Sequence, residues 1–212
     1  MGERWDTGRT EAFSDGVFAI AITLLVLDIH VPSNELDHLA RSLLEGWPSY
    51  LAFVTSFLTI GGVWLVHHGL FSRLKQIDVR MIRLNLLLLM AVTFLPFPTR
   101  LMADSLVDAH AERTAVLVYG ANLFLIAVLL AAMYRIAATH PDVLVDDVDP
   151  TQVRALSRRL VPGAPAIIVA LALAILEPRL AAFLYLVISV VLVLGARPPR
   201  MPSSGDPSTA PL

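Results

Sequence analysis

Residues 9–29 read RTEAFSDGVFAIAITLLVLDI, an apolar run with polar side chains near both ends. About 20 mostly apolar residues cross the ~30 Å hydrocarbon layer of a membrane as a helix, and this run has that length. Its internal acidic residues, and the lack of a small-residue cleavage pattern before the next polar loop, distinguish it from a cleavable signal peptide. We therefore expect a transmembrane helix near residues 12–30, with a functional role for the charges that it carries.

Five further apolar stretches follow the first one. They lie near residues 48–71, 84–102, 114–135, 160–176 and 180–196. The 212-residue chain is 56% hydrophobic and only 16% charged, whereas a soluble domain is about 25% charged. Its mean hydropathy is +0.69. We therefore expect an all-α integral membrane protein with six transmembrane helices in one domain, residues 1–197. Residues 198–212 are rich in Pro and Ser, which predicts a disordered cytoplasmic tail.

The distribution of Lys and Arg predicts the orientation, because cytoplasmic loops carry an excess of both. With the N-terminus inside, the regions on that side hold twelve of the 16 Lys and Arg residues. They are Arg4, Arg9, Arg73, Lys75, Arg80, Arg83, Arg135, Arg154, Arg158, Arg159, Arg197 and Arg200. The regions on the other side hold Arg41, Arg100, Arg113 and Arg179. Both termini are therefore expected in the cytoplasm, in a multi-pass protein of the cell membrane.

The composition argues against several classes of protein. The net charge of −2 provides no basic surface for a nucleic acid. The absence of cysteine removes disulfides and thiolate metal sites. His67 and His68 are adjacent but lack a nearby Glu-x-x-His or Cys pattern, so they make a poor metal-ligand set. No nucleophile elbow or phosphate-binding loop is present either. We expect no enzyme, no cofactor, no bound metal and no nucleic-acid partner.

Polar side chains of the first three predicted helices fall at a similar depth in the membrane. They are Ser14 and Asp15 in the first helix, Trp64, His67 and His68 in the second, and Asn85 in the third. Polar groups buried in lipid need partners, so a shared layer of hydrogen bonds is expected here. Since neighbouring residues on a helix point about 100° apart, only one of His67 and His68 is expected to join it. A carboxylate favoured by the helix N-terminus is the alternative explanation for Asp15.

A stripe of mostly apolar residues follows one face of the first helix. Ile20, Thr23, Leu24 and Leu27 are spaced i, i+3, i+4 and i+7. Asp15 lies about 140° away from Ile20 around the helix, so it points away from the stripe. Such a stripe is typical of ordinary helix packing and is also compatible with the lining of a pore.

The string Arg9-x-x-x-Phe13-Ser14-Asp15, with its continuation to Ile29, resembles the signature of the transmembrane protein 175 family. That family comprises endosomal and lysosomal potassium channels and their prokaryotic relatives. Further positions fit: Trp64 with His67 and His68, and Asn85 followed by Leu95-Pro96-Phe97-Pro98-Thr99. The resemblance covers most of the chain and is strongest in residues 9–29.

The resemblance implies a potassium-permeable cation channel without a carbonyl filter. Four chains would form a homotetramer in membrane lipid, with four copies of the first helix around a central pore. Ile20, Leu24 and Leu27 would form the constriction, with Thr23 as a polar ring and potassium as the permeant ion. The residues implied to brace the helices are Arg9, Phe13, Ser14, Asp15, Trp64, His67, His68 and Asn85.

Two other functions remain open at this point. A secondary transporter or proton pathway would use Asp15 with His67 or His68 as a relay, although the internal repeats and broken helices typical of transporters are not evident. A non-conducting scaffold would bind a partner through the loop 136–159. Flux that follows a pH gradient would favour the first, and a tetramer without any ion flux would favour the second.

Overall fold

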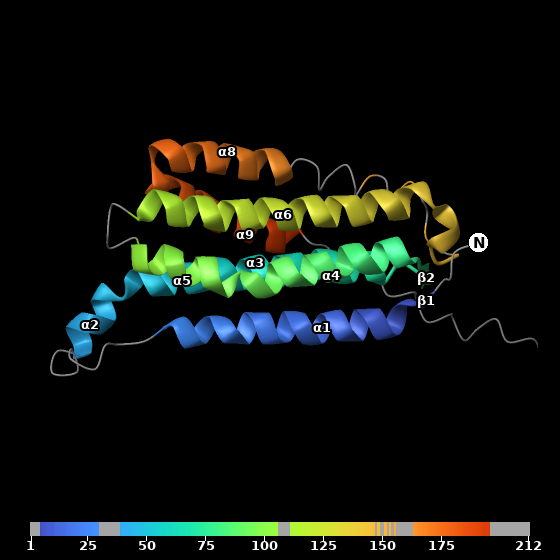
Figure 1. Cartoon of the computed structure of the whole chain (residues 1–212), viewed down its shortest axis with the longest axis horizontal. Helices are drawn as coiled ribbons and strands as arrows, with labels where there is room; N and C mark the ends of the chain where they lie inside the picture. The colour runs from blue at the N-terminus through green and yellow to red at the C-terminus, as the bar shows by residue number, and fades with distance from the viewer. Residues whose placement is uncertain are drawn as a thin grey trace, which may run out of the picture.

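The computed structural model describes residues 5–29, 39–105, 111–146, 148, 151, 153, 155 and 163–195. Its long helices run side by side in one bundle (Figure 1). In chain order the elements are β1 (Trp5–Asp6), α1 (Thr7–Leu24), the 3₁₀ helix η1 (Leu25–Asp28), α2 (Leu39–Glu45), α3 (Trp47–Phe71), β2 (Gln76–Ile77), α4 (Val79–Phe94), α5 (Pro96–Ser105), α6 (Glu112–Thr139), the 3₁₀ helix η3 (Pro141–Val143), α8 (Gly163–Leu176) and α9 (Pro178–Gly195). The predicted tail, residues 198–212, lies outside the described residues.

Helical stretches long enough to span a membrane dominate this bundle. Within the described residues, five stretches qualify by length and composition, with mean hydropathies between 1.7 and 2.4. They are Thr7–Asp28, Trp47–Phe71, Val79–Ser105, Glu112–Thr139 and Pro178–Gly195. The prediction of a helical, multi-pass membrane protein is therefore confirmed. Helix α8 is apolar but has only 14 residues, so the sixth crossing stays a prediction.

The helix ends differ from those expected from hydrophobicity, because capping groups decide them. Helix α1 begins at Thr7 rather than near residue 12, since the Asp6 side chain accepts a hydrogen bond from the Gly8 amide at 3.2 Å. The stretch expected as one helix at 84–102 begins at Val79 and is interrupted at Leu95. Pro96 follows the interruption and has no amide hydrogen to donate, which explains the break between α4 and α5.

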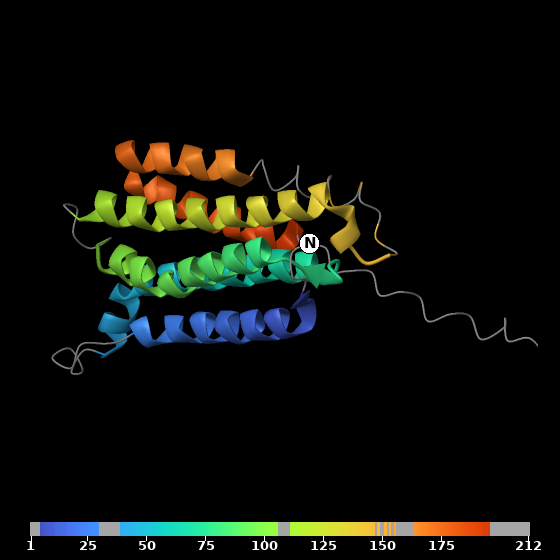
Figure 2. The same ribbon diagram turned by 45° about the vertical axis from the view of Figure 1, so that its right-hand side comes forward.

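Helix α1 lies along one edge of the bundle, and α8 lies along the opposite edge (Figures 1 and 2). Helix α1 packs against α3 and α4, whereas α8 packs against α6 and α9. Helix α3 occupies the middle and contacts α1, α5 and α9. Because α1 has its helical neighbours on one side, its other side faces out of the protomer.

Hydroxyl side chains link α3, α5, α6 and α9 in the interior. Thr59 Oγ1 lies 2.6 Å from Ser189 Oγ, and Ser56 Oγ lies 2.7 Å from Thr99 Oγ1. The Tyr119 hydroxyl lies 3.2 Å from Ser56 Oγ. All five side chains are buried. Hydrogen bonds between helices satisfy polar groups that have no water in the membrane core, so this cluster stabilises the half of the bundle away from α1.

A close approach of α6 and α9 depends on Gly120. A Cβ atom at Gly120 would overlap the Tyr185 hydroxyl and lie 2.8 Å from Leu171 Cδ2. We expect Gly120→Ala to lower the free energy of unfolding by about 1–3 kcal/mol, because the added methyl overpacks the interior. Reversible unfolding of the purified protein in detergent would measure this change.

The matched control is Gly61→Ala, since a Cβ at Gly61 meets nothing within 4 Å. That variant reports the gain in helix propensity alone, up to about 1 kcal/mol. The Tyr185 hydroxyl has no hydrogen-bond partner in the described structure, so Tyr185→Phe should restore part of the stability of Gly120→Ala. Equal stability of both alanine variants would show that α6 and α9 are not in close contact here.

Short segments at the end of the bundle that contains Trp5 and Asp6 are joined to one another by backbone pairing. Strand β1 runs antiparallel to β2, with Trp5 opposite Ile77. Leu74 forms an isolated bridge with Leu144. The Lys75 ammonium lies 2.6 Å from Asp146 Oδ1, and this hydrogen bond lowers the pKa of the Asp146 carboxyl. The start of α1, the α3–α4 connection and the segment after α6 therefore form one unit, which the hydrophobic pattern did not predict.

Candidate functional site

A chain of hydrogen bonds joins α1, α3 and α4 near the start of α1. Asn85 Nδ2 donates to Ser14 Oγ at 2.9 Å, and His67 Nε2 lies 2.8 Å from Asn85 Oδ1. Ser14 Oγ in turn donates to the Thr10 carbonyl at 2.8 Å. Ser14, His67 and Asn85 are fully buried. The structure thus brings together three side chains that the sequence placed at one depth, and we call Ser14, His67 and Asn85 the polar layer.

His67 closes one end of the polar layer. Because Asn85 Oδ1 can only accept, His67 Nε2 is the donor in their hydrogen bond. The His67 ring stacks on Phe71 with centroids 4.3 Å apart, and the Phe18 ring lies at 5.3 Å. Its Nδ1 atom has no hydrogen-bond partner in the described structure. The rings of Phe71 and Phe18 therefore pack against the histidine that ends the polar layer.

A second set of contacts fastens α1 to α3 beside the polar layer. Trp64 Nε1 donates to Asp15 Oδ1 at 2.8 Å. His68 Nδ1 lies 3.0 Å from Glu11 Oε1 but outside hydrogen-bonding geometry. The His68 ring stacks on Trp64, with centroids 5.6 Å apart. Glu11 was missed by the sequence reasoning, although it lies one helical turn before Asp15 and so shares its face.

The predicted constriction residues lie on the exposed side of the first helical stretch, Ile20 and Leu24 in α1 and Leu27 in the 3₁₀ helix η1 that follows it. Ile20, Leu24 and Leu27 are 59%, 43% and 71% exposed in the single protomer. The Thr23 hydroxyl is also exposed, and it donates to backbone carbonyls of its own helix, those of Ala19 and Ile20. Nothing in the described part of the chain covers this stripe. It is available to line a pore, to face lipid or to meet another subunit.

Arg9 and Phe13 do not join the polar layer within one protomer. Both side chains are exposed, Phe13 by 57%. They lie eleven and seven residues before Ile20, respectively, which places them within about 20° of its direction on the helix. Their expected bracing role therefore stays a prediction, and it would have to act between subunits.

The described residues of this region do not form a metal site. Across the described ranges, no group of three or more His, Cys, Asp or Glu side chains could hold a metal ion. What the arrangement provides is a helix anchored firmly on one face and apolar on the other. The fold and the polar layer thus define a multi-pass α-helical membrane protein. One side of its first helix, α1, is exposed in the single protomer.

Comparison with known proteins identifies its family. The model of the family described as endosomal/lysosomal potassium channel TMEM175 matches residues 9–96, which contain the polar layer and the contacts of Asp15 and Glu11 with α3. A potassium channel from Chamaesiphon minutus is 42% identical over 195 residues, covering 91% of this chain and 96% of that protein. The chain therefore belongs to the TMEM175 family.

Structural comparison agrees with the sequence relationship. The crystal structure of a lysosomal potassium-selective channel TMEM175 homologue from Chamaesiphon minutus superposes with a TM-score of 0.81 at 41% identity, covering 90% of this chain and 98% of that one. An endosomal/lysosomal proton channel TMEM175 from Gallus gallus is 38% identical over 149 residues, which is 66% of this chain but 30% of that protein. The family and these relatives are ion channels rather than enzymes.

Proposed function

We propose that the protein is a potassium-permeable cation channel of the cell membrane. It assembles as a homotetramer, and four copies of α1 surround the pore. The observation that carries this proposal is the two-sided character of α1: its polar groups bind inward to α3 and α4, while a mostly apolar stripe that includes Thr23 faces outward. The potassium channel that is 42% identical over nearly the whole chain supports the choice of ion.

The constriction works by excluding water. Rings of four Ile20, Leu24 and Leu27 side chains leave a narrow apolar passage, and such passages block ions by dewetting. A small outward movement of the four helices wets the passage. The Thr23 hydroxyls then replace part of the hydration shell of the ion. Because no ring of backbone carbonyls is involved, we expect weak discrimination of potassium over sodium.

The polar layer keeps the stripe aimed at the axis. A rotation of α1 about its own axis would break the Asn85–Ser14 and Trp64–Asp15 hydrogen bonds together. Breaking them leaves polar groups unpaired in a medium without water, which is unfavourable. The layer therefore acts as a brace for α1 and lies behind the pore wall.

The proposal is tested on purified full-length protein in liposomes. We expect native mass spectrometry to show four chains, and we expect a potassium gradient to drive flux that protein-free liposomes lack. Sodium flux under the same gradient measures the selectivity. Four chains without flux in any ionic condition would favour the scaffold function, and a monomer would contradict the central pore.

A proton pathway is the second candidate, because the Gallus gallus relative is named a proton channel. The polar layer offers a run of hydrogen bonds from His67 to Ser14. That run ends on the Thr10 carbonyl at one side and among aromatic rings at the other. It therefore gives a proton no onward partner, and this favours the bracing role. Acidification of liposomes that persists when potassium is absent, and that disappears in Asp15→Asn, would favour the proton pathway instead.

A further inference from the structure

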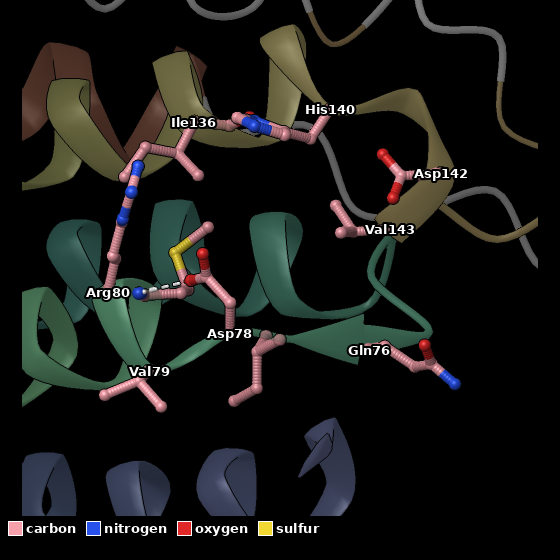
Figure 3. Close-up of a pocket in the computed structure, with 10 residues that line it drawn as sticks. Gln76, Asp78, Val79, Arg80, Ile136, His140, Asp142 and Val143 are labelled. Atoms are coloured by element: carbon pink, nitrogen blue, oxygen red, sulfur yellow. Dashed lines mark hydrogen bonds between the residues drawn. The ribbon is translucent and has the colours of Figure 1, made fainter. Parts of the chain in front are cut away.

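The two ends of the first helical stretch are held in different ways. At the start of α1, strand β1 pairs with β2, and Asp78, which follows β2, caps α4 by accepting the Met81 amide at 2.8 Å (Figure 3). At the other end, α1 continues into η1, which packs against α3 and α5. The start of α1 is therefore fixed by backbone pairing, whereas the position of η1 depends on side-chain contacts with these two helices.

The change from an α-helix to a 3₁₀ helix decides which side chains follow the exposed stripe. A 3₁₀ helix turns about 120° per residue, whereas an α-helix turns about 100°. In the 3₁₀ winding of η1, Leu27 lies directly over Leu24, and Asp28 points about 120° away from Leu24. If the same residues were α-helical, Asp28 would point within about 40° of Leu24. The winding of η1 therefore determines whether a carboxylate joins the stripe.

The exposure of the side chains agrees with this geometry. Leu24 and Leu27 are 43% and 71% exposed, whereas the Asp28 side chain is only 22% exposed. The Ile29 amide donates to the Val26 carbonyl at 3.1 Å, and this spacing of three residues is that of a 3₁₀ helix. In this winding the stripe thus remains apolar as far as Leu27, and the carboxylate lies beside it.

Arg100 lies on the side to which Asp28 turns. Its Nη1 atom is 4.0 Å from Asp28 Oδ1, and its Nε atom is 3.7 Å from Asp104 Oδ2. Arg100 and Asp104 are one turn apart on α5, so Asp104 restrains the guanidinium next to η1. Asp28 has a further interaction in the chain, so Arg100 is one of its partners. This ion pair connects η1 to α5.

We propose that Arg100 is a positioning residue for the end of the pore formed by η1. By pairing with Asp28, it favours the 3₁₀ winding and keeps the carboxylate off the stripe. Hydrogen bonds have poorer geometry in a 3₁₀ helix than in an α-helix. Without the ion pair, η1 therefore rewinds toward an α-helix, and Asp28 turns toward the pore axis.

The consequence of rewinding is an acidic ring. Four Asp28 carboxylates around one axis attract cations and provide the oxygen ligands that Ca²⁺ prefers. Exposed ion pairs contribute little to stability, and the Arg100 side chain is 57% exposed, so a single substitution changes the balance between the two windings. This inference rests on the fourfold assembly of the proposed function.

Inhibition of potassium flux by Ca²⁺ tests the proposal in liposomes that contain the purified full-length protein, with Ca²⁺ on both sides of the membrane. We expect Arg100→Gln to be inhibited at Ca²⁺ concentrations at least about tenfold lower than wild type, because its carboxylates form a cation site. Adding Asp28→Asn to Arg100→Gln should restore the wild-type sensitivity. A general loss of packing changes the amount of flux but creates no Ca²⁺ site.

Arg113→Gln is the matched control. Arg113 is exposed in the first turn of α6, and in the described part of the chain it forms no ion pair with Asp28. The variant loses the same charge and should keep the wild-type sensitivity, as should Arg100→Lys, which keeps the positive charge. Unchanged sensitivity in Arg100→Gln, or an increase that persists after Asp28→Asn is added, would overturn the proposal.

Calorimetric titration of the purified tetramers with Ca²⁺ separates this proposal from the channel function, because it requires no flux. Ca²⁺ binding to Arg100→Gln that is lost on adding Asp28→Asn, in a protein without flux, would retain the role of Arg100 and reject the channel. Wild-type potassium flux, with neither Ca²⁺ binding nor inhibition in Arg100→Gln, would reject the role of Arg100 and retain the channel.

Discussion

Replacing Ile20 with asparagine is expected to raise the resting potassium flux by about tenfold or more, which corresponds to a barrier lower by at least about 1.4 kcal/mol. Ile20 is 59% exposed on the stripe of α1, and four copies would form an apolar ring at the proposed constriction. An amide side chain binds water, so the ring stays hydrated and an ion no longer has to enter a dry passage. Fluorescence-monitored flux into liposomes at a fixed potassium gradient measures the change.

The matched control for this change is Leu86→Asn. Leu86 is 51% exposed in the protomer but belongs to α4, away from the proposed axis. It receives the same substitution without altering the constriction, so its flux should remain at the wild-type level. Unchanged flux in a correctly assembled Ile20→Asn tetramer would remove Ile20 from the narrowest part of the pore. Equal increases in both variants would indicate a leak caused by general loss of packing.

Hydrophobicity predicted the five helical stretches that are long and apolar enough to span a membrane, but it could not predict where the helices begin and end. Long apolar runs dominate the sequence, and each run is recognisable from its length and hydrophobicity alone. The start of α1 at Thr7 depends on one carboxylate, Asp6, and the break before α5 depends on Pro96. Such local groups contribute little to a hydropathy pattern. The β1–β2 pairing is shorter still, with only two residues in each strand.

The depth of the polar layer within the bundle was predictable from the sequence, but the hydrogen-bond partners of its side chains were not. Helical geometry placed Ser14, His67 and Asn85 at a common level, since Ser14 and Asn85 lie in the first half of their helices and His67 lies near the end of a helix that runs the opposite way. It could not decide between His67 and His68, because that choice depends on how far α3 is rotated about its own axis. The structure shows His67 turned to Asn85 and His68 turned to Glu11.

Replacing Asn85 with leucine is expected to be the most destabilising single change at the site. It removes both hydrogen bonds that connect α4 to α3 and α1, and it leaves the His67 Nε2 donor unpaired in the interior. Interhelical hydrogen bonds in membranes contribute about 0.6 kcal/mol on average, and a stranded buried donor costs about 1–3 kcal/mol. We expect a loss of about 1–3 kcal/mol, measured by reversible unfolding in sodium dodecyl sulfate, and a lower yield of tetramer.

Asn122→Leu is the comparison that separates the bracing role of Asn85 from the general effect of removing a buried amide side chain. Asn122 is also buried and donates one hydrogen bond, to the Ala91 carbonyl at 3.0 Å. Its loss leaves no side-chain donor unpaired, so the expected effect is smaller. Adding Ser14→Ala to Asn85→Leu should lower stability little further, because both changes remove the same interaction. If Asn85→Leu instead assembled with wild-type stability and an altered ion preference, the polar layer would have to lie in the conduction path, and the position of α1 would need another cause.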